Sequence, residues 1–171
     1  AWYDHWLKGM DSGAVDGPAC IVETGGGDVL ELDNWPPQED GLLETRTFYL
    51  GQKEKLLPEF RIDLNVDEPD SFLQRPLYVS EERGKLVYRR APFTEDVQLA
   101  GSPILKFYAS LAQKDTTWRV DMYEGGHQSP WPITKSWLRA SLRKRVPEED
   151  TPWQIKHDYT KFDYPVPGEV Y

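Results

Sequence analysis

Cysteine is nearly absent from this chain, and its absence excludes two kinds of protein. Cys20 is the only cysteine among 171 residues, so an intrachain disulfide framework and a cysteine-rich zinc site are both ruled out. The apolar residues on either side of it favour a buried structural thiol over a nucleophile. Long apolar runs are also missing, because no stretch approaches the ~20 residues that a membrane-spanning helix needs. We therefore expect no membrane partner.

Basic residues are also fewer than acidic ones. The 20 lysines and arginines face 29 aspartates and glutamates, which gives a formal net charge of -9, and nonspecific nucleic-acid binding needs the opposite balance. The one basic run, residues 139–145, is soon followed by the acidic residues 148–150, which cancel most of its field. We interpret the run as a solvated strand end and expect no nucleic-acid partner.

The residue types that carry hydrolytic or metal chemistry do not form a recognisable site. None of the eight serines lies in the Gly-x-Ser-x-Gly elbow of an α/β-hydrolase. The three histidines lack the His-Glu-x-x-His spacing of a catalytic zinc site, and His5 is expected on the solvent side of a short helix. We predict no catalytic residue, no metal ligand and no cofactor in this chain.

The first eight residues predict that helix, with aromatic rings on one face. Trp2, Tyr3 and Trp6 fall at positions that share a helical face, and Gly9 is placed to cap the C-terminus. A helix of this length is not stable alone in water. Its aromatic face must pack against another part of a protein, and we expect that part to lie upstream.

From residue 17 onward, short apolar runs bounded by glycine, proline, aspartate and asparagine predict strands and turns. The predicted strands are Ala19–Thr24, Val29–Leu32, Arg46–Leu50, Phe60–Val66, Lys85–Arg89, Asp96–Ala100, Ile104–Ala112, Trp118–Tyr123 and Ile133–Leu142. A hairpin turn is predicted at residues 25–27. No long helical pattern separates the strands, which argues against a parallel sheet. We therefore predict a mainly β chain, an antiparallel β-sandwich preceded by a short N-terminal helix.

The aromatic residues leave more than one function open. Seven tryptophans, nine tyrosines and six phenylalanines could supply a sugar-binding platform, which would make the chain a carbohydrate-binding module. Most of these rings, however, fall at strand positions that the core or the domain interface of a sandwich would use. An adhesion or assembly sandwich is a third class. The sequence leaves the oligomeric state open, a homo-oligomer included.

Several motifs, in order along nearly the whole chain, resemble one family of serine hydrolases. Residues 2–9 (Trp-Tyr-Asp-His-Trp-Leu-Lys-Gly) resemble the helix that follows the catalytic histidine in the X-Pro dipeptidyl-peptidase and cocaine-esterase family. Residues 91–101 (Ala-Pro-Phe-Thr-Glu-Asp-Val-Gln-Leu-Ala-Gly) are similar to that family's strand entry. Residues 114–118 and 137–141 (Trp-Leu-Arg-Ala-Ser) resemble its acidic turn and a later strand, although Thr117 replaces an aspartate of the turn motif.

The resemblance implies a jelly-roll β-sandwich, often described as galactose-binding-like, packed against an α/β-hydrolase domain. Residues 1–16 would be the helix and linker at the end of that upstream domain, and residues 17–171 the sandwich, truncated at its C-terminus. The family's Ser-His-Asp triad would lie before residue 1. The parent protein would then be a serine hydrolase of the esterase or dipeptidyl-peptidase type, and this chain alone would be inactive.

Two sets of residues receive a role from the resemblance. Trp2, Tyr3 and Trp6 would form the interface with the upstream domain of the same polypeptide. Phe72 and Leu73, at the apolar tip of the loop from residue 67 to residue 74, occupy the region that approaches the pocket for a small ester or peptide substrate. A plain turn with a tucked Phe72 is the alternative for that loop.

Nothing in the sequence fixes the cellular compartment of the protein, although the cytoplasm is favoured.

Overall fold

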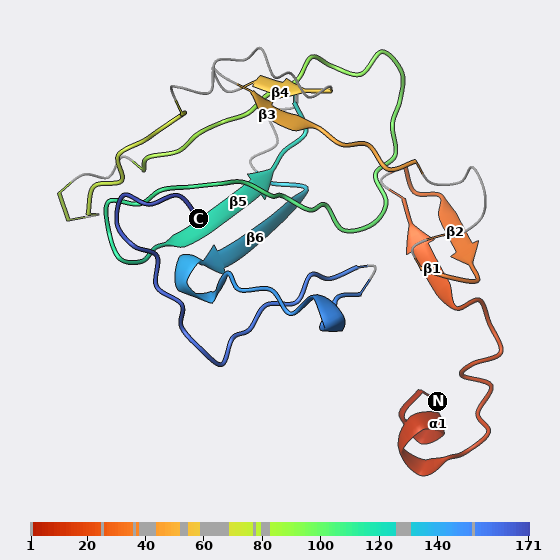
Figure 1. Cartoon of the computed structure of the whole chain (residues 1–171). Helices are drawn as coiled ribbons and strands as arrows, with labels where there is room; N and C mark the ends of the chain where they lie inside the picture. The colour runs from red at the N-terminus through yellow and green to blue at the C-terminus, as the bar shows by residue number, and fades with distance from the viewer. Residues whose placement is uncertain are drawn as a thin grey trace. The chain divides into compact units, whose positions relative to one another are not determined.

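The computed structural model describes residues 2–24, 26–35, 37, 44–51, 55–58, 69–76, 78–79, 83–125, 131–151 and 153–171 (Figure 1). These residues form antiparallel two-stranded sheets and one short N-terminal helix, which confirms the mainly β prediction. The chain divides into two compact units, one comprising Ala1–Leu43 with Gln98–Tyr171 and the other Glu44–Val97. The jelly-roll strand order stays a prediction.

Helix α1 spans Trp2–Lys8 and ends as the sequence predicts. Gly9 adopts a left-handed backbone conformation with φ of 66°, and its N–H donates to the carbonyl of His5 at 3.0 Å, which is the αL capping arrangement that favours glycine. Lys8 pairs with Asp4 one turn earlier, at 2.6 Å. Within the described ranges, no helix is long and apolar enough to cross a membrane.

Strands β1 (Cys20–Glu23) and β2 (Val29–Leu32) form the predicted first hairpin. The N–H of Thr24 donates to the carbonyl of Asp28 at 2.8 Å, and Gly27, with φ of 88°, supplies the left-handed residue of the turn. Cys20 lies opposite Leu32 in the register. Its side chain is partly exposed, so the prediction of a buried thiol was wrong, because a single two-stranded hairpin offers too little packing to enclose its side chains.

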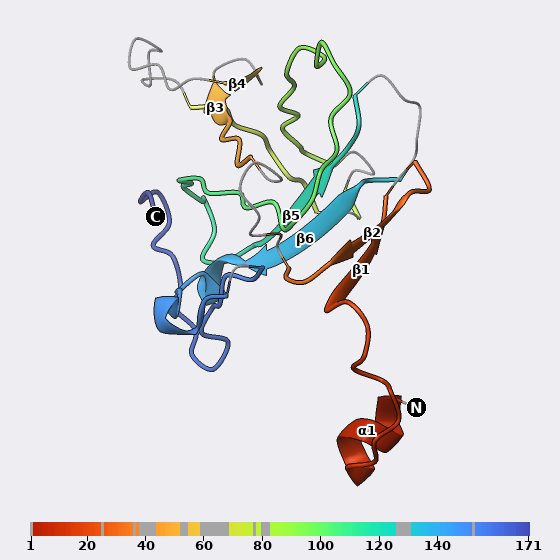
Figure 2. The same cartoon turned by 90° about the vertical axis from the view of Figure 1, so that its right-hand side faces the viewer.

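Strands β5 (Thr117–Met122) and β6 (Thr134–Arg139) form the longest hairpin of the described chain, and they lie side by side in both views (Figures 1 and 2). Trp118 pairs with Leu138 on one face, and Arg119 pairs with Trp137 on the other. The Trp118 and Leu138 side chains are partly buried, whereas Arg119 and Trp137 are exposed. The hairpin therefore has one inward and one outward face, as the alternating sequence predicts.

The second unit contains strands β3 (Tyr49–Gly51) and β4 (Lys55–Leu57). The N–H of Leu56 donates to the carbonyl of Arg89 at 2.8 Å, which places the chain around residue 89 on the other edge of β4. Strand β4 was not predicted, because four charged or polar residues, 52–55, precede Leu56 in the sequence. The predicted strand Phe60–Val66 lies outside the described residues.

Three predicted strands were wrong, one began too early and one ended too late. Residues 85–89, 96–100 and 104–112 form no strand, apart from single bridges at Arg89 and Ser110. Their β-forming composition is not enough, because strand formation depends on a neighbouring strand as well as on propensity. The strand predicted for residues 46–50 begins only at Tyr49. Residues 140–142 leave the ladder of β6 and form the 3₁₀ helix η1 (Ala140–Leu142). A second 3₁₀ turn, η2, spans Pro147–Glu149.

Few side chains are fully enclosed among the described residues. Leu32 is 9% exposed, Ala140 1% and Ser141 0%. Ala140 and Ser141 lie directly after β6, where the chain turns back toward the start of β5. The small side chains allow this close approach of the backbone, since the N–H of Ala140 donates to the carbonyl of Thr116 at 2.8 Å.

This packing predicts that Ala140→Leu destabilises the first unit. The added carbons have no free space at a site that is 1% exposed, and overpacking of this kind costs about 1–3 kcal/mol. The measurement is the free energy of unfolding from urea denaturation. Ala112→Leu, at an exposed position of the same unit, is the control and should change it by less than about 0.5 kcal/mol. Equal values for the two variants would contradict the prediction.

Candidate functional site

The carboxylate of Asp115 connects the start of β5 with the end of β6. One of its oxygens accepts hydrogen bonds from the backbone N–H groups of Thr116 and Ser141, both at 3.0 Å. The other accepts from Ser141 Oγ at 2.8 Å and from Arg139 Nε at 2.6 Å. These bonds join the two motifs at residues 114–118 and 137–141. The Asp115 side chain thus fixes the residue at which β6 ends and the following turn begins.

The environment of Asp115 favours its ionised form. Burial of the carboxyl raises its pKa, but the hydrogen bonds from Ser141 and Arg139 lower it by more, and the pKa of Asp115 therefore lies below its usual value. Since Asp115 is only 15% exposed, solvent competes little for these bonds. The arrangement has the partners of a structural carboxylate, and it contains no nucleophile beside a general base.

The basic run at residues 139–145 was predicted to be a solvated strand end, but only Arg139 lies in a strand and Ala140 and Ser141 are buried. Arg145 forms an ion pair with Asp150, one of the acidic residues that follow the run. Arg143 pairs with Asp163 at 3.1 Å, and its carbonyl lies 2.9 Å from Nδ1 of His157. Each arginine of this run forms an ion pair with a carboxylate, and the expected absence of a nucleic-acid partner stays a prediction.

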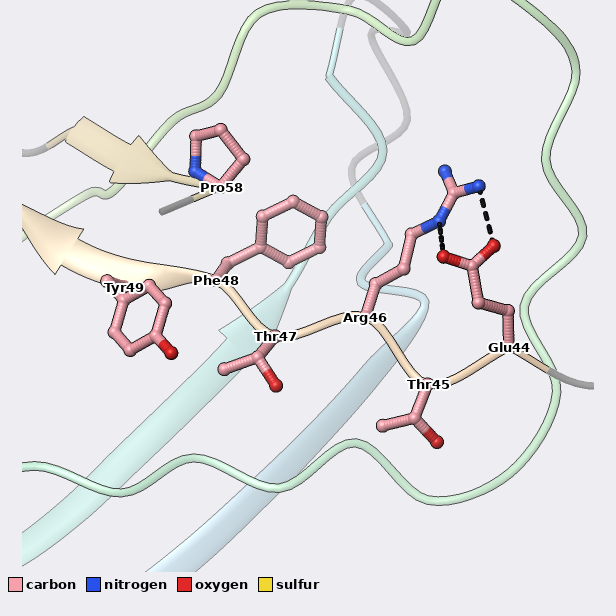
Figure 3. A pocket seen from close by; sticks show the side chains of 7 residues that line it. All are labelled: Glu44, Thr45, Arg46, Thr47, Phe48, Tyr49 and Pro58. Atoms are coloured by element: carbon pink, nitrogen blue, oxygen red, sulfur yellow. Dashed lines mark hydrogen bonds and ion pairs between the residues drawn. The ribbon is translucent and has the colours of Figure 1, made fainter. Parts of the chain in front are cut away.

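A surface pocket of about 330 Å³ lies along the segment that leads into β3 (Figure 3). Its lining residues are Glu44, Thr45, Arg46, Thr47, Phe48, Tyr49 and Pro58. Figure 3 shows that Arg46 and Phe48 point to one side of the chain and Thr45 and Thr47 to the other, as in an extended strand. The pocket offers hydroxyl groups and flat rings to a ligand, but it has no acid/base pair for catalysis.

The charged groups of this pocket neutralise each other. Arg46 Nε and Nη2 donate to the two oxygens of Glu44 at 3.2 and 3.0 Å, which lowers the pKa of Glu44 and raises that of Arg46. Behind the wall formed by Phe48, the Arg90 guanidinium lies 5.2 Å from the Phe48 ring and 3.5 Å from the Phe93 ring. Aromatic stacking is the main contact of Arg90 within the described part of the chain.

The predicted pocket-wall residues lie beside a neighbouring segment and do not line this pocket. Phe72 is 42% exposed and Leu73 is 73% exposed. A side chain at Gly84 would meet Phe72 Cδ2 at 2.4 Å and the Leu73 carbonyl at 2.7 Å, so only glycine allows this approach. Gly84 N–H also donates to Gln74 Oε1 at 3.1 Å. The role of Phe72 and Leu73 against a substrate stays a prediction.

The predicted interface residues on α1 are open to solvent. Trp2 is 59% exposed, Tyr3 75% and Trp6 59%, and the rings of Trp2 and Trp6 lie 5.7 Å apart. His5 was expected on the solvent side, but it is less exposed than these rings and packs edge-on against Trp6 at 5.0 Å. The apolar groups, rather than the histidine, face outward. The partner of this face stays a prediction.

No group of three or more His, Cys, Asp or Glu side chains that could hold a metal ion occurs among the described residues. His127 lies outside them.

Comparison with known protein families identifies the family of this chain. The sequence model of the X-Pro dipeptidyl-peptidase C-terminal non-catalytic domain matches residues 14–171. The chain belongs to this family.

Two curated relatives of this C-terminal domain family are similar over most of the chain. A protein of Bacillus cereus named "Putative Xaa-Pro dipeptidyl-peptidase" is 23% identical over 169 residues, which covers 93% of this chain. A protein of Bacillus anthracis with the same name is 24% identical over 168 residues, again covering 93%. The chain spans 28% of the length of each relative. No solved structure matches the chain.

The structure assigns a role to Asp115 and Ser141 that sequence reasoning missed. Both residues lie in motifs that resemble this C-terminal domain family, but the motifs did not reveal that they meet. A signal was present, because an aspartate directly before a threonine-rich strand start often accepts from the next backbone N–H groups. Its second partner lies 26 residues later, and such a contact depends on the hairpin register.

The Asp115 network predicts an acid-dependent loss of stability. The folded pKa lies below the unfolded value of about 3.9, so the stabilisation is complete above that value and is lost as the pH falls through the folded pKa. Asp115→Asn should lower the free energy of unfolding at pH 7 by about 1.5–3 kcal/mol and flatten its decline as the pH falls below about 4. Urea titrations at pH 7 and at a series of acidic pH values on both sides of about 4 measure both effects.

Asp11→Asn serves as the matched control for the Asp115 variant. Asp11 is exposed, and its replacement should leave the pH dependence of unfolding unchanged. If Asp115→Asn and the original chain gave parallel curves of stability against pH, the carboxylate network would not be the source of the acid dependence.

Proposed function

We propose that this chain is the C-terminal, non-catalytic β-sandwich of a serine hydrolase, and that it braces the catalytic domain of the same polypeptide. The observation that carries the proposal is the family match over residues 14–171. The names of the two Bacillus relatives favour a dipeptidyl-peptidase over an acyl esterase as the parent protein. The chain's small share of the relatives' length, 28%, leaves room for a catalytic domain.

The chemical step would belong to residues outside this chain. In a Ser-His-Asp hydrolase, the serine oxygen attacks the substrate carbonyl while the histidine accepts the serine proton and passes it to the leaving group. Backbone N–H groups stabilise the negative charge on the carbonyl oxygen. Water then attacks the acyl-enzyme and releases the acid. The substrate of the parent protein would be a peptide or a small ester.

The bracing role falls on α1 in this proposal. Its seven residues are too few to form a stable helix alone, and its exposed Trp2, Tyr3 and Trp6 rings are the residue types that dominate protein interfaces. Fully burying a large ring of this kind gains roughly 1.5–3 kcal/mol. Phe72 and Leu73, both exposed, are proposed to add to the wall of the substrate pocket.

A carbohydrate-binding module is the second candidate function. It is favoured by the exposure of strand-borne rings, of which Trp137 is 54% exposed, because flat rings stack on sugar faces. Enhanced or quenched tryptophan fluorescence on addition of a neutral polysaccharide would support it.

The first prediction from the proposed function concerns activity. The gene that encodes this chain should also encode, upstream, a Gly-x-Ser-x-Gly elbow followed by an aspartate and a histidine. The full-length protein should release p-nitroaniline from an Xaa-Pro p-nitroanilide, and replacing the elbow serine by alanine should abolish this. Residues 1–171 alone should show no activity. Hydrolysis by the purified fragment that survives chromatography would contradict the proposal.

The second prediction concerns the brace. In the full-length protein, the double variant Trp2→Ala, Trp6→Ala should weaken the association of this chain with the catalytic domain by about 2 kcal/mol or more, as for buried interface tryptophans. Thermal unfolding should then separate into two transitions, read by calorimetry. Trp153→Ala removes a ring that is 51% exposed outside α1 and is the control. Unchanged melting in the double variant would exclude α1 as the brace.

A further inference from the structure

Cations and aromatic rings alternate on the outward face of the β5–β6 hairpin. The Arg119 guanidinium lies 5.7 Å from the centre of the Trp137 ring, and Lys135 Nζ lies 5.6 Å from the same ring. Arg119 is the cross-strand partner of Trp137, while Lys135 precedes it by two residues and so shares its face of the sheet. Trp137 is therefore held between two positive charges.

The same pattern continues beyond the end of β6. Arg139 shares the face of Trp137, and its guanidinium lies 5.0 Å from the ring of Phe162. Phe162 in turn stacks on Tyr164, with ring centres 5.7 Å apart and an interplanar angle of 21°. We call the resulting set the cation–aromatic strip; it consists of Arg119, Lys135, Trp137, Arg139, Phe162 and Tyr164.

The rings of the cation–aromatic strip are only half covered. Trp137 is 54% exposed, Phe162 50% and Tyr164 53%. Tyr164 also borders a surface hollow of about 490 Å³, whose other lining residues are Lys114 and Pro165 to Pro167. Large apolar surface of this kind, gathered on one face, is a typical sign of an interaction site.

The charge of the strip is positive on a chain whose net charge is -9. Arg119 is paired with Asp121 at 3.0 Å and Arg139 with Asp115 at 2.6 Å. Carboxylates of the same chain therefore partly neutralise two of the three cations. Lys135 has no ion pair in the part of the chain that the structure describes. An approaching surface with carboxylates would complete this pattern, because it would meet Lys135 and the outer N–H groups of both arginines.

We propose that the cation–aromatic strip is the docking surface for a carboxylate-bearing face of the catalytic domain of the same polypeptide. This inference rests on the proposed function and adds a second contact to that of α1. The chain spans only 28% of the length of its relatives, so most of such a protein is available as the partner. Tryptophan, tyrosine and arginine are also the residues that most often dominate binding energy at protein interfaces.

Two other occupants fit the strip less well. A second copy of this chain, docked symmetrically, would place Arg119, Lys135 and Arg139 against their own counterparts, and like charges at an interface are repulsive. A sugar would stack on Trp137, but a neutral one gives the cations no partner. An anionic polysaccharide meets both requirements and is included in the test for that reason.

The test uses the full-length parent protein with a specific protease site inserted in residues 10–16, which belong to no helix or strand. Cleavage after folding leaves α1 on the catalytic piece, so residues 17–171 are then held only by other contacts. We expect the pieces to co-elute in size-exclusion chromatography at low salt and to separate at high salt. Trp137→Ala should raise their dissociation constant about 10–30-fold, and Lys135→Glu about 3–10-fold.

Controls separate loss of the contact from loss of the fold. Trp153→Ala removes another half-exposed tryptophan of the same unit and should leave the dissociation constant unchanged. Lys135→Glu changes an exposed side chain that lies over the Trp137 ring, so it tests the strip even if Trp137→Ala does not fold. Circular dichroism of each variant checks folding before cleavage.

Each other outcome overturns the inference in a distinguishable way. If the pieces co-elute and neither strip variant weakens them, the strip is not the docking surface, and bracing through α1 still stands. If the unmodified pieces separate even at low salt, the strip does not hold the domains together, and the α1 variants alone decide the bracing role. If polygalacturonate quenches tryptophan fluorescence of the intact protein, and Trp137→Ala removes the effect, the strip is a glycan site instead.

Discussion

The Asp115 carboxylate is the constraint on which the β5–β6 hairpin and the turn after it depend. It accepts four hydrogen bonds, two from backbone N–H groups and two from side chains. An ionised carboxylate can satisfy that many donors, whereas a neutral amide cannot. By capturing the N–H of Ser141, Asp115 takes the chain out of the β6 ladder and into a 3₁₀ turn. The start of β5 and the end of β6 are thus fixed by one negative charge.

The sequence carried enough information for the local elements of the fold. Short apolar runs bounded by turn residues predicted β1, β2, β5 and β6, and Gly9 marked the end of the helix because a left-handed residue is needed there. The exact end of β6 was not predictable, since it depends on Asp115, which lies 26 residues before Ser141. Strand β4 was not predicted for a similar reason. Its charged first residue, Lys55, pairs with Gly51 of β3 and with Arg89, and neither pairing is visible in the local sequence.

The candidate functional residues were likewise only partly predictable from the sequence. The sequence identified Trp2, Tyr3 and Trp6 from helical spacing, and all three rings are exposed. It could not identify the cation–aromatic strip, because Arg119 and Trp137 become neighbours only through the cross-strand register. Phe72 and Leu73 were chosen because the family resemblance implies that their loop approaches the substrate pocket. Their actual neighbour, Gly84, comes from a separate segment, and local composition does not reveal such a contact.

Arg139 is shared between the interior of the first unit and its surface. Its Nε donates to Asp115, while its guanidinium plane covers the ring of Phe162. Substitutions at residues 115 and 162 should therefore be non-additive, since each changes what the same arginine can contact. Natural variation at these two positions would be correlated, and a designer who wished to alter the outer rings would have to preserve the buried carboxylate that orients them.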